Sequence, residues 1–485
     1  MTPQPDRCSH TLARHLPSGS TFLLKDAGSY RKPIAVQHPC VCKDAAGKFS
    51  RASINFPVRE HIRWWQDAII YEAYVDKFAG NFKNFTHQLW YLEKLGVTCI
   101  HLLPHYSSPM VDEGYDVSDY RAIREDLGTL EDFSAFVAET ERRGMRIIID
   151  LVLNHTSTTH PWFREAQRSS SSVKRDFYLW SKTGKEFADA VNAFKHLKPR
   201  NWIYNPKTHD YYFSTFYSEQ ADLNWDNPEV LKEMLAIMDF WMTLGVSGFR
   251  LDAVTHLIKR EGTNCKSLPE VHHILKNLRK HVEAVNPEIV LLAEAYDSIL
   301  KARAYFGDGD ECHLAYNFPL MGQMFFALAR GRENLVRETL KESTDIPEQC
   351  SWAAFLRCHD EIMLTLFPPD TRQEILAYLD PKSNYLFNNG TGTSVRLASI
   401  WPNNAEKLRQ VFRWFFSMPG SLVWYYGDEI GMENEGLEHA FRDTRLYVRG
   451  TFDWNAANAQ AHNPDSLFAY VAGLIRERKK IRKAL

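Results

Sequence analysis

The chain has 485 residues, 44% of them hydrophobic and 24% charged, a composition typical of a globular protein with a large core. Its formal net charge of −2 excludes the broadly basic surface that nucleic-acid binding requires. Residues 1–20 are polar, and no apolar run approaches the roughly 20 residues that span a bilayer. We therefore expect neither a signal peptide nor a membrane segment. The eight cysteines are scattered, which favours reduced thiols in a cytoplasmic protein.

The first 63 residues form an N-terminal extension for which the sequence indicates no function. Within it, the stretches 21–24 and 52–56 are predicted to be short strands around a polar loop. Strand and helix patterns begin to alternate at Trp64.

Eight short apolar runs are predicted to be strands, and amphipathic stretches lie between most of them. The run 146–151 is almost continuously apolar, which is typical of a strand buried on both faces. The alternation predicts an α/β protein, a (β/α)8 TIM barrel. A doubly wound sheet is the alternative, although no glycine-rich phosphate loop follows any strand. The predicted strands are 68–71, 98–103, 146–151, the start of 248–256, 289–293, 313–318, 353–356 and 421–425, and the predicted helices are 87–95, 133–143, 228–244, 269–285, 321–341, 405–416 and 466–481.

The regular alternation stops after the third predicted strand. Residues 156–222 are rich in Ser, Asn, Lys and aromatic residues and contain no long amphipathic stretch. Because such a stretch is too long for an ordinary loop, we predict an inserted lid subdomain over 156–222. The barrel itself then comprises residues 64–155 and 223–485.

Charged residues follow the predicted strands at the ends where a (β/α)8 barrel carries its chemistry. Arg250 and Asp252 lie two residues apart, so both side chains leave the same face of a strand. Taken alone, such a pair is more often an ordinary ion pair at a strand end. However, Glu294 and the pair His359–Asp360 follow later strands. Three carboxylates at neighbouring strand ends are electrostatically unfavourable, so a purely structural role does not explain them. Converging carboxyls raise one pKa and so supply a proton donor beside an ionised nucleophile, as retaining glycoside hydrolysis requires.

Four segments resemble, in the same order, the four sequence regions of the α-amylase family of retaining glycosidases and transglycosidases. They are residues 150–155, 248–256, the segment around Glu294, and 355–361. The resemblance covers residues 64–485. It implies that Asp252 is the nucleophile, that Glu294 is the acid/base, and that Asp360 holds the 2- and 3-hydroxyls of the sugar.

The same resemblance implies supporting roles for three basic residues. Arg250 would orient Asp252 and keep it ionised, while His155 and His359 would donate hydrogen bonds to glucosyl hydroxyls. For the two histidines alone, core residues bonded to backbone would be an equally good interpretation.

Residues 220–224 resemble the fifth sequence region of the oligo-1,6-glucosidase branch, with Ala221 where proline is usual. The likeness to this branch implies that Asp112 binds the terminal glucose, that Tyr115 stacks on its face, and that Arg449 pairs with Asp112. Together these residues would form a pocket for one glucose at the non-reducing end. The alternative interpretation of Asp112 and Tyr115, which we consider weaker, is a solvated turn.

Further likenesses concern the substrate. Ala253, after the expected nucleophile, resembles members that act on α-1,4 bonds. Residues 249–254, 260–265, 305–313 and 425–431 are similar to the maltose/trehalose glucosyltransferases of the branch. We therefore expect a retaining enzyme for short α-glucosides such as maltose, trehalose or sucrose. A hydrolytic exo-α-glucosidase or sucrose hydrolase is the alternative, and a non-catalytic sugar-binding barrel is a remote one.

The chain also departs from the family. The segment 76–85 carries a single carboxylate, too few oxygen ligands for the calcium usual in this branch, so neither metal nor cofactor is expected. The family's C-terminal β-domain is expected to be absent, Cys358 replaces a usual asparagine, and residues 385–401 are expected to reshape the acceptor side. The expected partners are small α-glucosides, not nucleic acid or membrane, and a homo-oligomer is left open.

Overall fold

The computed structural model describes residues 36–43, 49–56, 63–439 and 441–483. In the first two ranges, β1 (Val36–Lys43) and β2 (Phe49–Phe56) pair antiparallel. The predicted strand 52–56 therefore lies within β2, while the predicted strand 21–24 lies outside the described residues.

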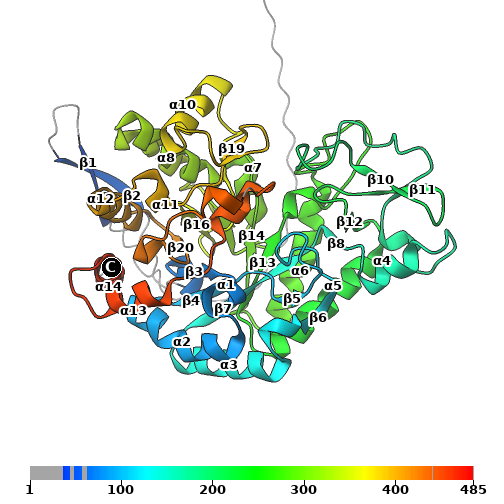
Figure 1. Cartoon of the computed structure of the whole chain (residues 1–485), viewed down its shortest axis with the longest axis horizontal. Helices are drawn as coiled ribbons and strands as arrows, with labels where there is room; N and C mark the ends of the chain where they lie inside the picture. Colours follow the sequence, from blue (N-terminus) through cyan, green and yellow to red (C-terminus); the bar gives the residue numbers. More distant parts are fainter. Residues whose placement is uncertain (1–35, 44–48, 57–62, 440, 484–485) are drawn as a thin grey trace, which may run out of the picture.

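Eight parallel strands close into a barrel, as the sequence predicted (Figure 1). Almost every residue of these strands is buried, because the strands face the barrel interior on one side and the helices on the other. Each of the eight strands predicted from residue 64 onward overlaps one of them. In order around the barrel they are β3 (Ile69–Ala73), β4 (Cys99–Leu102), β7 (Arg146–Val152), β13 (Gly248–Asp252), β14 (Val290–Ala293), β15 (Leu314–Tyr316), β16 (Ser351–Phe355) and β20 (Ser421–Tyr425).

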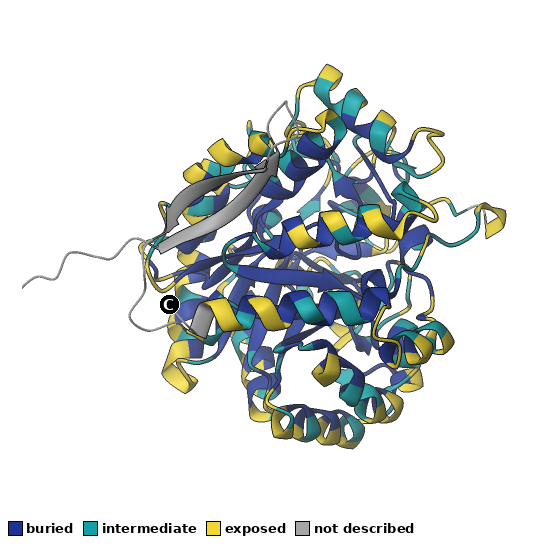
Figure 2. Ribbon diagram, turned by 90° about the vertical axis from the view of Figure 1, so that its left-hand side faces the viewer, coloured by how far each residue is buried: buried dark blue, intermediate teal, exposed yellow. Residues whose placement is uncertain are grey.

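Helices surround the barrel, with their buried faces toward the strands (Figure 2). The predicted helix 321–341 is divided, because Gly331 takes a left-handed conformation with φ +61° and ends α8. The remainder forms a 3-10 turn and the short helix α9. The outer helices are α2 (Phe82–Leu95), α3 (Leu130–Arg142), α5 (Pro228–Thr243), α6 (Glu270–Val285), α8 (Phe318–Arg330), α9 (Arg337–Glu342), α12 (Ala405–Phe416) and α14 (Leu467–Lys483).

The chain also forms shorter helices and strands outside the barrel, and the sequence patterns did not predict most of them. The helix α10 (Pro369–Leu379) is the longest of those missed, and α13 (Trp454–Ala461) packs beside α14. The others are α1 (Val75–Ala79), α7 (Ile299–Arg303), β5 (Tyr106–Ser107) and β6 (Asp119–Ile123). No helix in the described part of the chain combines the length and apolar composition that crossing a bilayer requires.

The chain between β7 and α5 lies beside the barrel, on the right of Figure 1. Lys259, in the loop after β13, joins it to the barrel, since its Nζ lies 2.6 Å from Asp222 Oδ2 and 2.8 Å from Asn154 Oδ1. The segment holds a sheet of order β10-β11-β9 and the antiparallel pair β8–β12. Its elements are β8 (His155–Ser157), α4 (Pro161–Ala166), β9 (Trp180–Ser181), β10 (Trp202–Asn205), β11 (Asp210–Phe213) and β12 (Gln220–Asp222).

A second small sheet follows β16, in the region where the sequence departs from the family. Its strands are β17 (Ile362–Met363), β18 (Leu386–Phe387) and β19 (Gly392–Thr393), and α11 (Leu397–Ile400) comes next. This sheet brings the loop 388–391 to the ends of the barrel strands, beside the cavity described below.

Candidate active site

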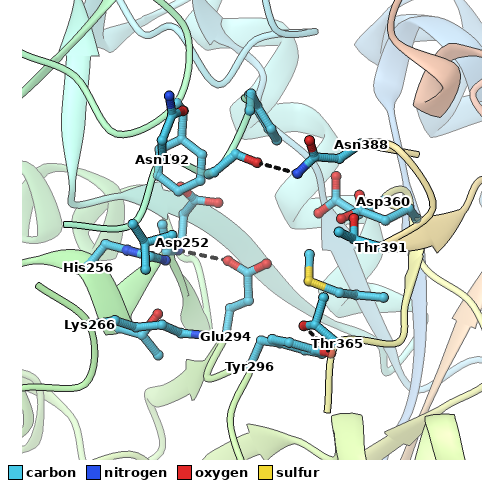
Figure 3. Close-up of a pocket in the computed structure, with 18 of the residues that line it drawn as sticks. Asn192, Asp252, His256, Lys266, Glu294, Tyr296, Asp360, Thr365, Asn388 and Thr391 are labelled. Atoms are coloured by element: carbon cyan, nitrogen blue, oxygen red, sulfur yellow. Dashed lines mark hydrogen bonds between the residues drawn. The ribbon is translucent and has the colours of Figure 1, made fainter. Parts of the chain in front are cut away.

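A cavity of about 430 Å³ opens at the carboxyl ends of the barrel strands, where chemistry is expected in this fold. Asp252, Glu294 and Asp360 face this space together (Figure 3). The structure thus brings the three predicted catalytic carboxylates into one site. Of the other predicted residues, Asp112, Tyr115 and His155 also line the cavity, whereas Arg250, His359 and Arg449 are buried behind its wall.

Arg250 organises one side of the cavity. The parallel register of β13 and β7 places it opposite Asp150, and its Nη1 donates to Asp150 Oδ1 at 2.6 Å. The same nitrogen donates to Asp252, two residues along the strand, while Nη2 lies 2.9 Å from Glu294 Oε1. One guanidinium therefore holds both Asp252 and Glu294.

The two carboxyls share this environment. Burial raises the pKa of Asp252 well above its ordinary value, against the opposing effect of Arg250 and with added repulsion from Glu294. Burial also raises the pKa of Glu294. Two such neighbours titrate as a pair. The expectation that Arg250 keeps Asp252 ionised is opposed by burial and by Glu294, which raise the pKa of Asp252 despite its contact with Arg250.

Ala253, directly after Asp252, adopts a left-handed conformation with φ +47°. This conformation is strained for a residue with a side chain and is often found at functional sites. It turns the backbone N–H of Ala253 toward Glu294, which accepts a hydrogen bond of 2.7 Å at Oε2. The strained turn thus fixes Glu294 beside Asp252.

Asp360 is held in its ionised form. Its Oδ1 accepts hydrogen bonds from Arg445 Nη1 at 3.1 Å and from Arg449 Nη2 at 2.9 Å, and its Oδ2 lies 3.1 Å from His359 Nε2. Burial alone would raise the pKa of Asp360, but these three cationic partners hold it well below its usual range.

The predicted pairing of Arg449 with Asp112 is wrong, because Arg445 makes that contact. Arg445 Nη2 donates to Asp112 Oδ1 at 2.8 Å, and Gln220 Nε2 donates to Asp112 Oδ2 at 3.0 Å. Arg449 instead donates to Asp360 and to the carbonyl oxygen of His359, the latter at 3.0 Å. The two arginines lie four residues apart in one irregular segment, so the sequence could not distinguish them.

Tyr115 and the two histidines pack around the same wall. The Tyr115 ring stacks on His359 with centroids 5.2 Å apart, and its hydroxyl donates to Asp150 Oδ2 at 3.1 Å and lies 2.7 Å from His359 Nε2. His155 Nε2 lies 3.2 Å from the carbonyl oxygen of Tyr115. Burial lowers the pKa of His155, so its ring is neutral and donates from this nitrogen. The predicted hydrogen bonds of the two histidines to sugar hydroxyls and the predicted stacking of Tyr115 on a glucose face stay predictions.

Several residues of the cavity were not predicted. Lys266 Nζ lies 5.0 Å from the ring centre of Tyr296, and Asn388 Nδ2 donates to the carbonyl oxygen of Ala193 at 3.1 Å (Figure 3). Burial and repulsion from the neighbouring Asp360 raise the pKa of Glu361 to about 8. Only Glu361 carried a sequence signal, its place next to His359–Asp360; the others lie in loops without a recognisable pattern.

Few side chains in the described part of the chain are placed to bind a metal. Asp76, the carboxylate of the segment expected to be too poor for calcium, lies 3.1 Å from Arg124 Nη2. Among the described residues, one group of three side chains brings possible ligand atoms within 4.8 Å, namely Glu72, Cys358 and His359. Its single carboxylate does not fit calcium, which takes six to eight oxygens.

Comparison with known proteins places these features in a family. The family described as "Alpha amylase, catalytic domain" matches residues 63–380. The trehalose synthase/amylase TreS of Mycobacterium tuberculosis is 40% identical over 419 residues, which cover 84% of this chain and 69% of that protein. The trehalose synthase of Thermus thermophilus is 41% identical over 81% of this chain, but the match spans only 41% of that longer protein.

Solved structures agree on the fold. An isomaltulose synthase from Klebsiella sp. LX3 superposes with a TM-score of 0.70 at 23% identity, covering 86% of this chain and 84% of that one. The α-glucosyl transfer enzyme XgtA gives the same TM-score and identity over 87% of this chain and 85% of that one. With its closed barrel, its carboxylates on separate strand ends and these matches, the chain belongs to the α-amylase family.

Proposed function

We propose that the protein is a retaining α-glucosyl enzyme that acts on short α-glucosides. The observation that carries the proposal is the joint placement of Asp252 and Glu294 on the Arg250 guanidinium, with Asp360 facing the same cavity. Retaining glycosidases use one carboxylate as nucleophile and a neighbouring carboxylic acid as proton donor. The two carboxyls titrate as a pair and can share one proton, which is the state that such a reaction requires, and the family resemblance assigns the proton to Glu294.

In the proposed reaction, the Asp252 carboxylate attacks the anomeric carbon while Glu294 protonates the departing glycosidic oxygen. The product is a covalent β-glucosyl-enzyme, and Glu294 is now the carboxylate. It then takes a proton from water or from an acceptor hydroxyl, whose oxygen displaces Asp252. Asp360, ionised and held by Arg445 and Arg449, would bind the 2- and 3-hydroxyls and stabilise the oxocarbenium-like transition state.

The contacts around Asp112 support a preference for short substrates. Asp112 is held by both Arg445 and Gln220, and its side chain and that of Arg445 are each only 6% exposed. A buried ion pair at the cavity wall favours a pocket for one terminal glucose over an open cleft for a long chain. The resemblance at Ala253 adds a preference for α-1,4 bonds.

We further propose glucosyl transfer between maltose-type and trehalose-type disaccharides as the main reaction. The names of the two trehalose synthases, each about 40% identical to this chain, favour it. A hydrolytic exo-α-glucosidase or sucrose hydrolase is the second candidate, since the first of those relatives is also named an amylase. Cys99, Cys265, Cys312, Cys350 and Cys358 are all buried, which suits a cytoplasmic enzyme.

Product analysis tests this proposal. The purified protein is incubated separately with maltose, trehalose and sucrose, and the sugars are followed by proton NMR. Transfer gives trehalose from maltose and the reverse, whereas hydrolysis gives glucose alone. Absence of turnover on all three sugars and on p-nitrophenyl α-glucoside, with no difference between the wild type and Asp252→Asn, would leave the non-catalytic sugar-binding barrel as the better description.

A further inference from the structure

Three polar residues lie on adjacent strands inside the barrel, beneath the cavity. Glu72 on β3 and His101 on β4 are register partners, and Asp150 lies on the next strand, β7. None of the three side chains has any solvent exposure. Buried ionisable groups are costly unless they are paired, so their arrangement calls for a physical explanation.

His101 bridges the two carboxylates directly. Its Nδ1 lies 3.3 Å from Glu72 Oε2, and its Nε2 lies 3.0 Å from Asp150 Oδ2. A carboxylate oxygen can only accept, and a neutral imidazole has only one N–H. Both contacts are therefore hydrogen bonds only when His101 carries two N–H groups and is an imidazolium.

Each carboxylate also holds one side of the active site. Asp150 accepts from Arg250, the residue that contacts Asp252 and Glu294. Glu72 Oε1 accepts from the backbone N–H of His359 at 2.8 Å and lies 3.0 Å from its Nδ1. Tyr115 connects the two sides directly, because its hydroxyl contacts both Asp150 and His359.

We propose that His101 is a permanently protonated positioning residue, which joins the Arg250 side of the site to the His359 side and balances the charges of Glu72 and Asp150. The proposal rests on the proposed glucosyl transfer and deepens it. His101 touches no reacting atom in this arrangement. It acts through Asp150 and Arg250 on the catalytic pair, and through Glu72 on the residue that precedes Asp360.

The surrounding charges agree with a protonated ring. Burial lowers the pKa of His101, but its hydrogen bonds with Asp150 and Glu72 outweigh burial and raise the pKa above its ordinary value. The cationic groups Arg250 and His359 do not reverse this, because each of them is paired with a carboxylate, Asp150 or Glu72, that also contacts His101. The ionisable groups of this buried cluster are Glu72, Cys358, His359, Tyr115, Tyr316, Asp150 and Arg250.

The test is His101→Gln, which keeps hydrogen-bonding capacity but removes the positive charge. Loss of this charge makes the local potential more negative and raises the pKa values of the Asp252–Glu294 pair. Both limbs of the pH profile of kcat/KM should then move upward by on the order of 0.5–1 pH unit. We also expect kcat to fall about 10–100-fold through misplacement of Arg250, with KM for p-nitrophenyl α-glucoside within about threefold of the wild type.

His105 provides a matched control four residues along the chain. It is also fully buried, but its ring packs between Phe133 and Trp241, and burial lowers its pKa to about 3. His105→Phe should therefore leave the pH profile unmoved. If His101→Gln lowers kcat while both limbs stay in place, His101 has only a packing role and the proposal is overturned.

A second measurement needs no variant and no activity. Neutron diffraction from wild-type crystals at pH 8 should show deuterium on both ring nitrogens of His101, and a single deuteron overturns the proposal. This keeps the test decisive if His101→Gln does not fold. It also separates the two proposals: an inactive wild type contradicts the glucosyl-transfer function, while the neutron result decides the state of His101 independently.

Discussion

Arg445 and Asp112 form an ion pair of 2.8 Å that connects the chain after β20 with the chain after β4. The same guanidinium reaches Asp360, so a single cation ties together two carboxylates of the proposed glucose pocket. Phe194, from the segment between β7 and α5, packs against it, with the Arg445 guanidinium carbon 4.6 Å from its ring centre. Three separate parts of the chain therefore depend on Arg445.

Arg445→Ala should disable the pocket for disaccharides. Removing one partner of a buried ion pair leaves Asp112 uncompensated, which costs about 3–5 kcal/mol. We expect kcat/KM for maltose to fall by about 100-fold or more, together with a lower melting temperature. Arg442→Ala is the control, since Arg442 is nearby but donates to the carbonyl oxygen of Leu197 at 3.0 Å. Equal losses in the two variants would argue against a specific role of the Arg445–Asp112 pair.

Asp252→Ala and Glu294→Gln should each lower turnover by about 10³–10⁵-fold. Both carboxyls are held at the cavity rather than within the apolar core, so the variants should stay folded, as circular dichroism can check. Glu294→Gln should lose less with p-nitrophenyl α-glucoside than with maltose, because a good leaving group needs little protonation. Normal maltose turnover by either variant would refute these roles.

The barrel could be predicted because its strands are short, apolar and regularly spaced. The run 421–425 matches β20 residue for residue, and the others differ at their ends. The helix α10 was missed because it buries only Ile375, Leu376 and Leu379 and so has little apolar periodicity, and β17–β19 were missed because each has only two residues. The break at Gly331 went unrecognised because apolar residues continue on both sides of it.

Within the site, only the residues that belong to family motifs could be predicted from the sequence. Asp252, Glu294 and Asp360 were found because each follows a strand within a family segment. Glu72 and His101 were not, since a polar residue within an apolar strand gives no sign of its partners on other strands. The choice between Arg445 and Arg449 likewise depends on contacts with Asp112, more than 300 positions away in the chain.

EDTA should leave both activity and melting temperature unchanged. Asp76, in the segment that the resemblance aligns with a calcium loop, lies 3.1 Å from Arg124 Nη2. A bound calcium would need several more oxygen ligands than this segment's single carboxylate supplies. The measurement compares p-nitrophenyl α-glucoside turnover and thermal unfolding with and without chelator. A loss that added calcium restores would show that other oxygens hold an ion.

Removing the Asn388 side chain should increase hydrolysis relative to transfer. Asn388 bonds to Ala193 and lies 3.2 Å from His196 Nδ1, so it links the loop 388–391 to the segment between β7 and α5 beside the cavity. Loss of this link admits water to the glucosyl-enzyme. Asn388 and Asn389 both have positive φ, so glycine fits either position, and Asn389→Gly is a matched control. The ratio of glucose to trehalose formed from maltose, measured by NMR, should rise about two- to fivefold in Asn388→Gly and should not change in Asn389→Gly. An unchanged ratio in Asn388→Gly would contradict this role of the link.

Stability should decline as pH rises from about 5 to 9. Burial, with repulsion from Asp360, raises the pKa of Glu361 to about 8, and the carboxylates Asp360 and Glu72 raise that of His359 to about 9 despite burial. A group whose pKa is raised by folding contributes stability that is complete below its unfolded pKa and is lost as pH rises through its folded pKa. The stability that Glu361 contributes therefore begins to fall near pH 4.5, and the stability that His359 contributes begins to fall near pH 6.5.

Glu361→Gln should flatten the decline in melting temperature between pH 5 and 8 by a few degrees, whereas Glu433→Gln, at an exposed position, should not. A decline of equal slope in wild type and Glu361→Gln would show that Glu361 is already ionised in the folded protein.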